Sequence, residues 1–313
     1  MKKLLFIVNP CSGKAKMRTE LLNAVATFSA ADYEVTVYPT KERADATRRA
    51  REIKQDEFDR IVVAGGDGTL NEVITGLMNT GVKCDLGYIP AGTLNEWSSG
   101  LKISRNIPKA AEDAASGVAV PLDIGKFNDR FFSYTASFGA FTDASYSASQ
   151  DVKNVLGQAA YFFQGIKSIA NIKPIHLRFE TDDCTVEDDF LFGAVSNSMS
   201  VGGIVKFKET VVKLNDGLFE VVLIKKPANI AKLQPVIDGI LKQDLDREGI
   251  VFLHTKKLTV TGGDGLSWTL DGEYAPGLET TIIENIPSAI HFIVPQNAEQ
   301  ISSLKEICAD VYN

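Results

Sequence analysis

The sequence predicts an α/β domain with a parallel sheet followed by an antiparallel β-sandwich, because its pattern changes once along its 313 residues. In the first ~120 residues, apolar strand candidates alternate with helical patterns, which is typical of parallel βαβ units. After Pro121, short alternating segments separated by turn residues dominate, as in an antiparallel sandwich or barrel. At roughly 100–200 residues per domain, the chain accommodates two domains, 1–121 and 122–313.

The elements of the predicted α/β domain follow this alternation. The run from Ile61 to Ala64 is entirely apolar, which indicates a strand buried on both faces of a parallel sheet. Helical patterns occupy roughly 16–30, 44–54 and 70–78. Strands are expected at 4–8, 34–38, 60–64 and 86–89.

The predicted β-sandwich contains one long helix at about 151–170, and a last helix at about 298–310 leaves packing against the first domain open. The sequence shows neither an internal repeat nor a low-complexity linker, so we expect a tight domain interface with the active site in a cleft between the domains. Strands are expected at 122–127, 175–180, 190–196, 218–224, 257–261, 267–270, 280–283 and 290–294.

Composition excludes several functional classes. A formal net charge of −7 argues against a nucleic-acid-binding protein, which usually carries a basic face, although a local patch would still permit membrane contact. The four cysteines form no Cys-x-x-Cys pair and there are only 3 histidines, so a zinc site is not expected and a reducing cytoplasm fits. The first apolar run, Leu4 to Val8, is too short for a signal peptide, and no stretch approaches the ~20 apolar residues that span a bilayer.

A glycine-rich loop carries the strongest chemical signal. The strand Ile61–Ala64 is followed by Gly65, Gly66, Asp67, Gly68 and Thr69, and then by a helical run. Such a turn exposes backbone N–H groups that bind phosphate. The carboxylate of Asp67 would repel phosphate unless a divalent cation lay between them. The alternative is a tight β–α turn with an incidental aspartate.

Two further loops repeat this design. Pro90–Glu96 also joins a strand to a helix through a Gly-Thr pair, and Asn9–Lys14 follows the first strand. The latter is not a Walker A loop, because Gly13 is its only glycine and no Ser or Thr follows Lys14, so a plain turn is its alternative reading. Loops at the carboxyl ends of neighbouring parallel strands face one crevice, where open α/β sheets bind ligands.

Together these motifs resemble the diacylglycerol kinase catalytic-domain family, which includes bacterial soluble lipid kinases and sphingosine kinases. The resemblance rests on Asn-Pro-x-Ser-Gly at 9–13, Gly-Gly-Asp-Gly-Thr-x-Asn-Glu-Val at 65–73 and Pro-x-Gly-Thr-x-Asn at 90–95, and it continues at 122–126, 138–144, 213–221 and 270–273. It implies ATP and Mg²⁺ as cofactors and a membrane lipid, most plainly diacylglycerol, as phosphoryl acceptor. It also implies a cytoplasmic protein that contacts the membrane surface peripherally, and it leaves a homodimer open.

The resemblance assigns roles to individual residues. Glu273 matches the proton acceptor and Asp67 the second catalytic group, and Lys213, Asp216 and Leu218 match a structural Mg²⁺ site. For the segments around Asp216 and Glu273, simple hairpin turns are the alternative. The cofactor-binding positions implied for ATP are Asn9, Thr40, Gly65, Gly66, Asp67, Gly68, Thr69, Asn71, Glu72, Gly92, Thr93 and Asn95.

One segment departs from the family pattern. The family usually has Asn-Asp-Phe-Ala-Arg after the second Gly-Thr, whereas this chain has Asn95-Glu96-Trp97-Ser98-Ser99. This departure keeps open a degenerate, non-catalytic lipid- or nucleotide-binding protein. A soluble-substrate kinase of the NAD kinase or phosphofructokinase type also stays open, because those kinases share the Gly-Gly-Asp-Gly-Thr loop. The basic residues between Lys41 and Lys54 are interleaved with acids, which favours a solvated helix face over a membrane-binding one.

Overall fold

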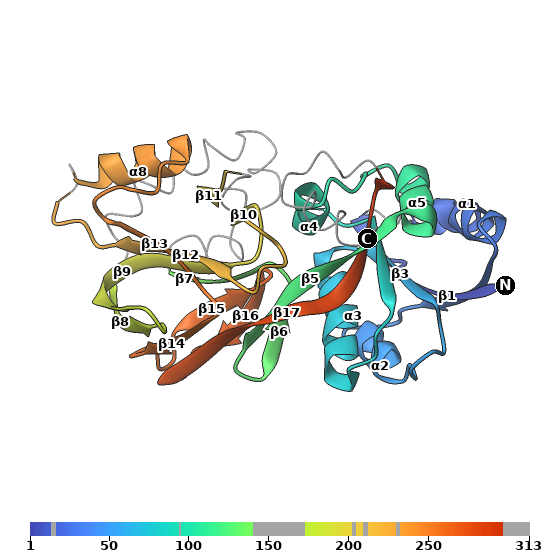
Figure 1. Ribbon diagram of the computed structural model, residues 1–313, viewed down its shortest axis with the longest axis horizontal. Coiled ribbons are helices and arrows are strands. Elements are labelled where there is room, and N and C mark those ends of the chain that lie inside the picture. Colours follow the sequence, from blue (N-terminus) through green and yellow to red (C-terminus); the bar gives the residue numbers. More distant parts are fainter. Residues whose placement is uncertain are drawn as a thin grey trace. The chain divides into compact units, whose positions relative to one another are not determined.

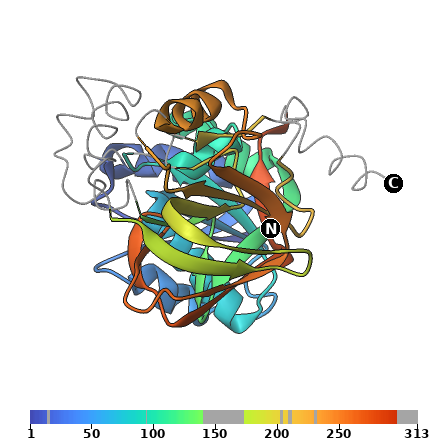
Figure 2. The same ribbon diagram turned by 90° about the vertical axis from the view of Figure 1, so that its left-hand side faces the viewer.

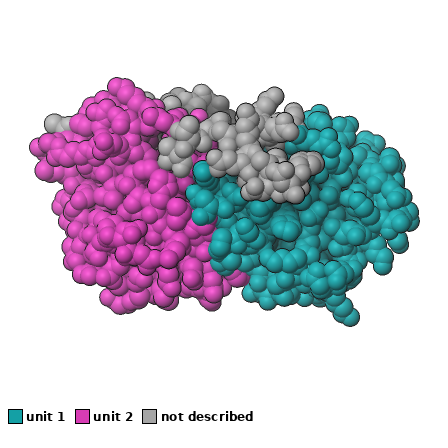
Figure 3. All heavy atoms as spheres, viewed as in Figure 1, with its two compact units in different colours: residues 1–124, 213–216, 286–313 teal, residues 125–212, 217–285 magenta. Residues whose placement is uncertain are grey.

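The computed structural model describes residues 1–13, 17–93, 95–139, 173–201, 205–208, 212–229 and 232–296 (Figure 1). The predicted helices at 151–170 and 298–310, the segment 140–144 and Lys14 lie outside these ranges. The chain divides into two compact units (Figure 3). The first takes residues 1–124, 213–216 and the chain from 286, and the second takes 125–212 and 217–285.

The first unit contains the predicted parallel sheet. Its strand order is β17-β4-β3-β1-β2, with every neighbouring pair parallel. Strand β3 is buried along its whole length, as its continuous apolar run predicts. The α/β class expected for this part of the chain is therefore confirmed. The strands are β1 (Lys2–Val8), β2 (Tyr33–Pro39), β3 (Arg60–Gly65), β4 (Asp85–Pro90) and the end of β17 (Thr280–Val294).

Helices cover both faces of this sheet (Figure 1): α1 and α5 lie on one face, and α2 and α3 on the other. Phe28 of α1 packs on Phe6 of β1, with ring centroids 5.2 Å apart. The helix α5 is absent from the sequence-based expectations; Asn106 caps it by accepting from the Lys109 N–H at 3.0 Å. The helices are α1 (Met17–Ala30), α2 (Asp45–Arg51), α3 (Asp67–Thr80), α4 (Glu96–Gly100) and α5 (Ile107–Ser116).

The second unit is built from antiparallel strands in the order β16-β15-β7-β9-β8-β14-β17, which confirms the predicted sandwich (Figure 2). The long strand β9 also pairs with β12, which pairs with β13. A short helix, α8 (Leu233–Lys242), and a small hairpin, β10 (Ser200–Val201) with β11 (Val205–Lys206), complete its described part. The main strands are β5 (Val118–Phe127), β6 (Arg130–Phe132), β7 (Thr135–Gly139), β8 (Ile175–Glu180), β9 (Thr185–Ser196), β12 (Phe219–Lys225), β13 (Ile250–Thr255), β14 (Lys257–Thr261), β15 (Ser267–Leu270) and β16 (Glu273–Pro276).

Aromatic side chains fill the core of the second unit. Trp268 is almost completely buried, and its ring centroid lies 4.8 Å from that of Phe138 and 5.1 Å from that of Phe127. Large aromatic side chains provide much buried apolar area per residue, so this cluster is a main source of the unit's stability.

Candidate functional site

The predicted phosphate-binding loops meet at the carboxyl edge of the parallel sheet. The strand register pairs Val8 with both Pro39 and Ala64, and Gly65 with Pro90, so four strands end at one level. Backbone hydrogen bonds continue just past these ends. Thr40 N–H donates to Val8 O, Asn9 N–H to Ala64 O, and Ala91 N–H to Gly65 O, each at 2.8 Å. Asn9, Thr40 and the two glycine loops are therefore neighbours in the first unit.

Glycines allow these loops to approach one another closely. A Cβ atom on Gly92 would lie 2.5 Å from Gly66 Cα, and one on Gly13 would lie 1.8 Å from Ala91 O. Both distances are shorter than any tolerated contact, so side chains at these positions are excluded. The loops after β1, β3 and β4 consequently touch one another through their backbones, with glycine at the points of closest approach.

Helix α3 begins at this surface. Gly66 is its N-cap residue and has no side chain with which to accept from the first helical N–H groups. Those N–H groups belong to Asp67, Gly68 and Thr69, and they lie at the positive end of a 14-residue helix. Asn9 Nδ2 donates to Thr69 Oγ1 at 3.0 Å and ties the first loop to the helix start. Such a helix start favours an anion.

Asp67 has two oxygens in different situations. Its Oδ2 accepts a hydrogen bond from Glu96 N–H at 3.0 Å. This bond joins the glycine loop after β3 to the start of α4. Its Oδ1 is buried and has no hydrogen-bond partner among the described residues. Burial raises the pKa of Asp67, although the backbone N–H groups of Glu96, Trp97 and Asn95 and the charge of Arg105 act to lower it. A buried acceptor of this kind fits a cation or one of its water ligands.

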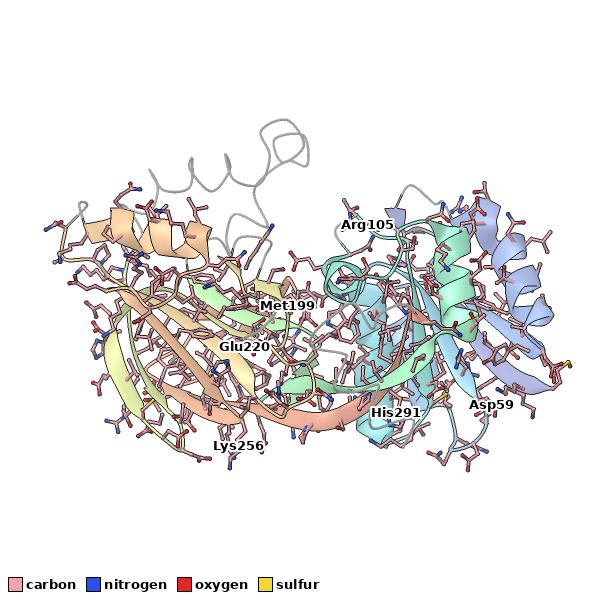
Figure 4. All side chains as sticks on the ribbon, turned by 45° about the horizontal axis from the view of Figure 1, so that its top comes forward. Asp59, Arg105, Met199, Glu220, Lys256 and His291 are labelled. Carbon is pink, nitrogen blue, oxygen red and sulfur yellow. The ribbon has the colours of Figure 1, made fainter. Side chains whose placement is uncertain are left out.

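Arg105 is the positive charge that acts on Asp67 in this electrostatic balance. It belongs to the segment between α4 and α5 and is exposed (Figure 4). The sequence-based assignment missed it because it lies outside the recognised motifs. Its guanidinium carries a permanent positive charge, which favours the ionised form of Asp67.

The side chain of Asn95 holds the glycine loop that follows β4. Its side chain is buried and its backbone has φ 51°, a left-handed conformation that asparagine tolerates. Its Oδ1 accepts from Gly92 N–H at 3.0 Å, and its Nδ2 donates to Gly92 O at 2.9 Å. The hydroxyl of Tyr88 lies 3.2 Å from the same Oδ1. Tyr88 is a second residue that sequence reasoning missed, although a tyrosine in a buried strand usually has a hydrogen-bond partner.

Glu72 and Asn71 lie one turn further along α3. The two carboxylate oxygens of Glu72 accept from Ala44 N–H at 2.9 Å and Ala46 N–H at 3.2 Å, so this side chain caps helix α2. Asn71 Oδ1 accepts from Thr75 Oγ1 at 3.3 Å within the same helix. Thr93, by contrast, is exposed at the loop surface. The ATP contacts implied for these residues stay predictions.

The segment that departs from the family pattern forms helix α4. Trp97 is buried and packs edge-on against Phe292 of β17, with ring centroids 4.7 Å apart. Ser98 is buried as well, and its hydroxyl donates to Asn95 O at 2.7 Å. The aromatic residue and the serine therefore serve the packing of the first unit.

The predicted structural metal segment is a turn. Asp216 and Lys213 are exposed, and Gly217 has φ 76°. Leu218 O accepts from Asn285 Nδ2 at 3.1 Å. The division between the two units falls between Asp216 and Gly217. Across the described part of the chain, no group of three or more His, Cys, Asp or Glu side chains is placed to hold a metal ion.

The turn that precedes Glu273 is organised by its neighbour Asp271. The buried Asp271 carboxylate accepts from three successive backbone N–H groups, Ser133 at 2.5 Å and Tyr134 and Thr135 at 3.0 Å each. Glu273 is exposed and opens β16, where it pairs with Leu270. A hairpin is thus present, and Asp271 fixes its geometry against the start of β7.

Comparisons with known proteins agree across nearly the whole chain. A model of the diacylglycerol kinase catalytic domain matches residues 3–127, and a model of the YegS C-terminal NAD kinase beta sandwich-like domain matches residues 136–294. The diacylglycerol kinase of Bacillus subtilis (strain 168) is 34% identical over 304 residues, covering 96% of this chain and 99% of that relative. The diacylglycerol kinase of Staphylococcus aureus (strain MRSA252) is 30% identical over 297 residues, covering 95% and 93%.

A solved structure shows the same likeness. The crystal structure of a diacylglycerol kinase from Bacillus anthracis str. Sterne matches with a TM-score of 0.75 and 26% identity, covering 94% of this chain and 97% of that chain. Among the described residues, no helix has the length and apolar character needed to cross a membrane.

Proposed function

The chain belongs to the diacylglycerol kinase family and is a lipid kinase, and we propose that it transfers the γ-phosphoryl group of ATP, with Mg²⁺, to the hydroxyl group of diacylglycerol. The product of this reaction is phosphatidic acid. The acceptor hydroxyl oxygen attacks the γ-phosphorus, the bond between that phosphorus and the β–γ bridging oxygen breaks, and ADP leaves. The acceptor proton is taken up by a carboxylate of the protein.

The glycine loops at the sheet edge carry this proposal. The Gly66–Gly92 approach leaves a backbone surface free of Cβ atoms, and the uncapped start of α3 adds oriented N–H groups beside it. Phosphoryl transfer depends mainly on positioning and on stabilising negative charge. Both requirements are met by backbone donors that need no rearrangement during the reaction.

Asp67 supports the proposed Mg²⁺ dependence. Its buried Oδ1 has no hydrogen-bond partner among the described residues, which fits a carboxylate that faces a cation or a cation-bound water. When bound with ATP, Mg²⁺ would neutralise charge on the phosphates. Asp216, with the main-chain carbonyls of Lys213 and Leu218, would hold a second, structural Mg²⁺, since hard cations prefer oxygen ligands.

Glu273 is the residue that we assign to the acceptor proton. It is exposed, so its carboxylate is accessible to the hydroxyl group of a lipid. The turn before it is held by the hydrogen bond from Ser133 N–H to Asp271. A general base must come within hydrogen-bond distance of the proton that it accepts. Because that hydroxyl belongs to a membrane lipid, we further propose peripheral contact with the cytoplasmic membrane surface, where ATP is available.

One assay tests the proposed function. The purified protein is incubated with radiolabelled ATP and Mg²⁺ and, separately, with diacylglycerol, ceramide, sphingosine, a polyprenol or NAD. We expect label in phosphatidic acid, and its loss when Mg²⁺ is chelated. Labelling of NAD alone would overturn the lipid acceptor, and a protein that labels none of the five acceptors would contradict the proposed reaction.

A further inference from the structure

Backbone carbonyl groups weaken phosphate binding when they point towards the phosphate. Each glycine offers an N–H group that attracts an anion and a carbonyl oxygen that repels one. A phosphate loop therefore works only if its carbonyls are held by other donors. In the first unit, the buried groups beneath the two glycine loops make such bonds.

The carbonyl of Gly65 is held by two donors. Ala91 N–H donates to it at 2.8 Å, and the hydroxyl of Tyr88 does so at 3.1 Å. Gly65 opens the loop that contains Asp67, and its carbonyl shares one planar peptide group with the Gly66 N–H, so fixing the carbonyl also fixes the direction of that N–H. A carbonyl with two donors on one side is fixed towards them.

Tyr88 is placed to be a permanent donor. It belongs to β4 and is 1% exposed. Burial raises the pKa of its hydroxyl, and the negative charge of Asp67 raises it further, against a smaller opposite effect of Arg105. The hydroxyl therefore stays protonated over the whole physiological pH range.

The carbonyl of Gly92 is held by the same network. Asn95 Nδ2 donates to Gly92 O at 2.9 Å, while Asn95 Oδ1 lies 3.2 Å from the Tyr88 hydroxyl. Ser98 in turn fixes the main chain of Asn95 through its bond to Asn95 O. The single proton of the Tyr88 hydroxyl is shared between two acceptors, Gly65 O and Asn95 Oδ1, so one buried O–H group links the supports of both glycine loops.

We propose that Tyr88 is a positioning residue of the phosphate site, whose hydroxyl, together with Asn95, holds the carbonyls of Gly65 and Gly92 away from bound phosphates. The inference rests on the proposed function, because it takes a nucleotide phosphate as the ligand. It assigns a binding role to a residue that lies in a buried strand and outside every recognised motif.

The test is the variant Tyr88→Phe, which removes only the hydroxyl. Binding of ATP with Mg²⁺ and of adenosine is measured by calorimetry, well below the melting temperature of each protein. We expect ATP to bind about five- to tenfold more weakly, the effect of losing about one hydrogen bond. Adenosine, which has no phosphate, should bind as in the wild type.

Tyr33→Phe is the matched control. Tyr33 is also buried in the sheet of the first unit, but it opens β2 at the opposite end from the glycine loops. Any general cost of losing a buried hydroxyl is shared by both variants and appears in the melting temperature. Only Tyr88→Phe should change the ratio of ATP affinity to adenosine affinity.

Asn95→Gly is a second variant, because glycine accepts the φ of 51° at this position while removing the side chain. It should weaken ATP binding at least as much as Tyr88→Phe does. Unchanged ATP affinity in a folded Tyr88→Phe protein, or an equal loss for adenosine, overturns the inference. If Tyr88→Phe does not fold, unchanged phosphate preference in Asn95→Gly overturns it. Absence of ATP binding by the wild type instead contradicts the proposed function.

Discussion

Asp67 combines two roles in one carboxylate. One oxygen fixes the start of α4 by accepting from Glu96 N–H, and the other is buried without a hydrogen-bond partner among the described residues. The sequence predicted its importance because an acid inside an anion-binding loop needs a cation. It could not predict the contact with α4, since 29 positions separate the two residues.

Asp67→Asn should separate these roles. Asparagine keeps an acceptor for Glu96 N–H, but it removes the charge, so we expect turnover to fall at least ~10²-fold. Because folding raises the pKa of Asp67, the ligand-free fold loses stability as the pH rises from the ordinary carboxyl pKa to the raised one, and this loss is complete above the raised pKa. The variant should therefore melt at or above the wild-type temperature at neutral pH.

Steady-state kinetics and thermal melting check both expectations. The control is Asp264→Asn, which neutralises an exposed carboxylate in a surface turn of the second unit. Near-normal turnover in folded Asp67→Asn would refute the assignment. A large drop in its melting temperature at neutral pH would show that the contact with α4 needs the charge.

Glu273→Gln should separate binding from transfer. The change keeps size and hydrogen bonding, so ATP affinity should stay within a few-fold of wild type while phosphoryl transfer falls by roughly 10²–10⁴. The lower end is expected, because a loose transition state needs little early deprotonation. ATP binding and lipid phosphorylation are measured on one preparation. Equal loss of both would assign Glu273 a structural role, and unchanged transfer would leave it the edge of a turn.

At the scale of elements, sequence patterns predicted best where one physical effect dominates. Continuous apolar runs identified the buried strands β1, β3 and β4. The helix expected at 44–54 begins one residue later, because Ala44 has φ 63°, and it already ends at Arg51, with Glu52 as its C-cap residue. The two strands expected at 280–283 and 290–294 are parts of one strand, β17, whose polar middle interrupts the apolar pattern without ending the strand.

Helix α2 shows why a motif residue need not contact a ligand. Its N-cap residue, Ala44, has no side-chain acceptor, and Glu72 of α3 supplies two. Arg48 pairs with the buried Asp45 within α2, and the half-buried Arg49 pairs with Glu57, so Arg49 also ties α2 to its surroundings. Local sequence could not show this pairing of helices, because the cap comes from another element.

Glu72→Ala should consequently act on stability. It leaves the N–H groups of Ala44 and Ala46 without their carboxylate acceptor, and loss of a helix cap costs about 1–2 kcal/mol in the free energy of unfolding. Urea denaturation measures this loss, and ATP calorimetry runs beside it. Glu34→Ala, at an exposed glutamate of β2, is the control. A variant with normal stability but impaired ATP binding would restore the predicted nucleotide contact.

At the scale of the whole molecule, chain order conceals how the units are assembled. Residues 213–216 and the chain from 286 belong to the first unit, although they follow most of the second. The change of pattern at Pro121 lies close to the first division between the units, which falls between 124 and 125. No such signal marks the two later segments, 213–216 and the chain from 286, that belong to the first unit. A strand has the same local pattern whichever sheet it joins.

The short segment 213–216 belongs to the first unit, and we expect a structural cation bound there to stabilise the fold. It offers an exposed carboxylate at Asp216, and it leaves the first unit after only four residues. A ligand that binds only the folded chain stabilises it in proportion to the logarithm of ligand concentration. Added Mg²⁺ should therefore raise the melting temperature of the wild type.

Asp216→Ala should lower the melting temperature and remove most of that Mg²⁺-dependent rise, because the remaining ligands are neutral carbonyls. The scans are run without nucleotide, and at constant ionic strength so that general screening is equal. Asp264→Ala is the control, since it removes an exposed turn carboxylate elsewhere and should keep the full Mg²⁺ response. Equal Mg²⁺-induced shifts in wild type and Asp216→Ala would leave 213–218 an ordinary turn, with Asn285 rather than a cation holding the Leu218 carbonyl.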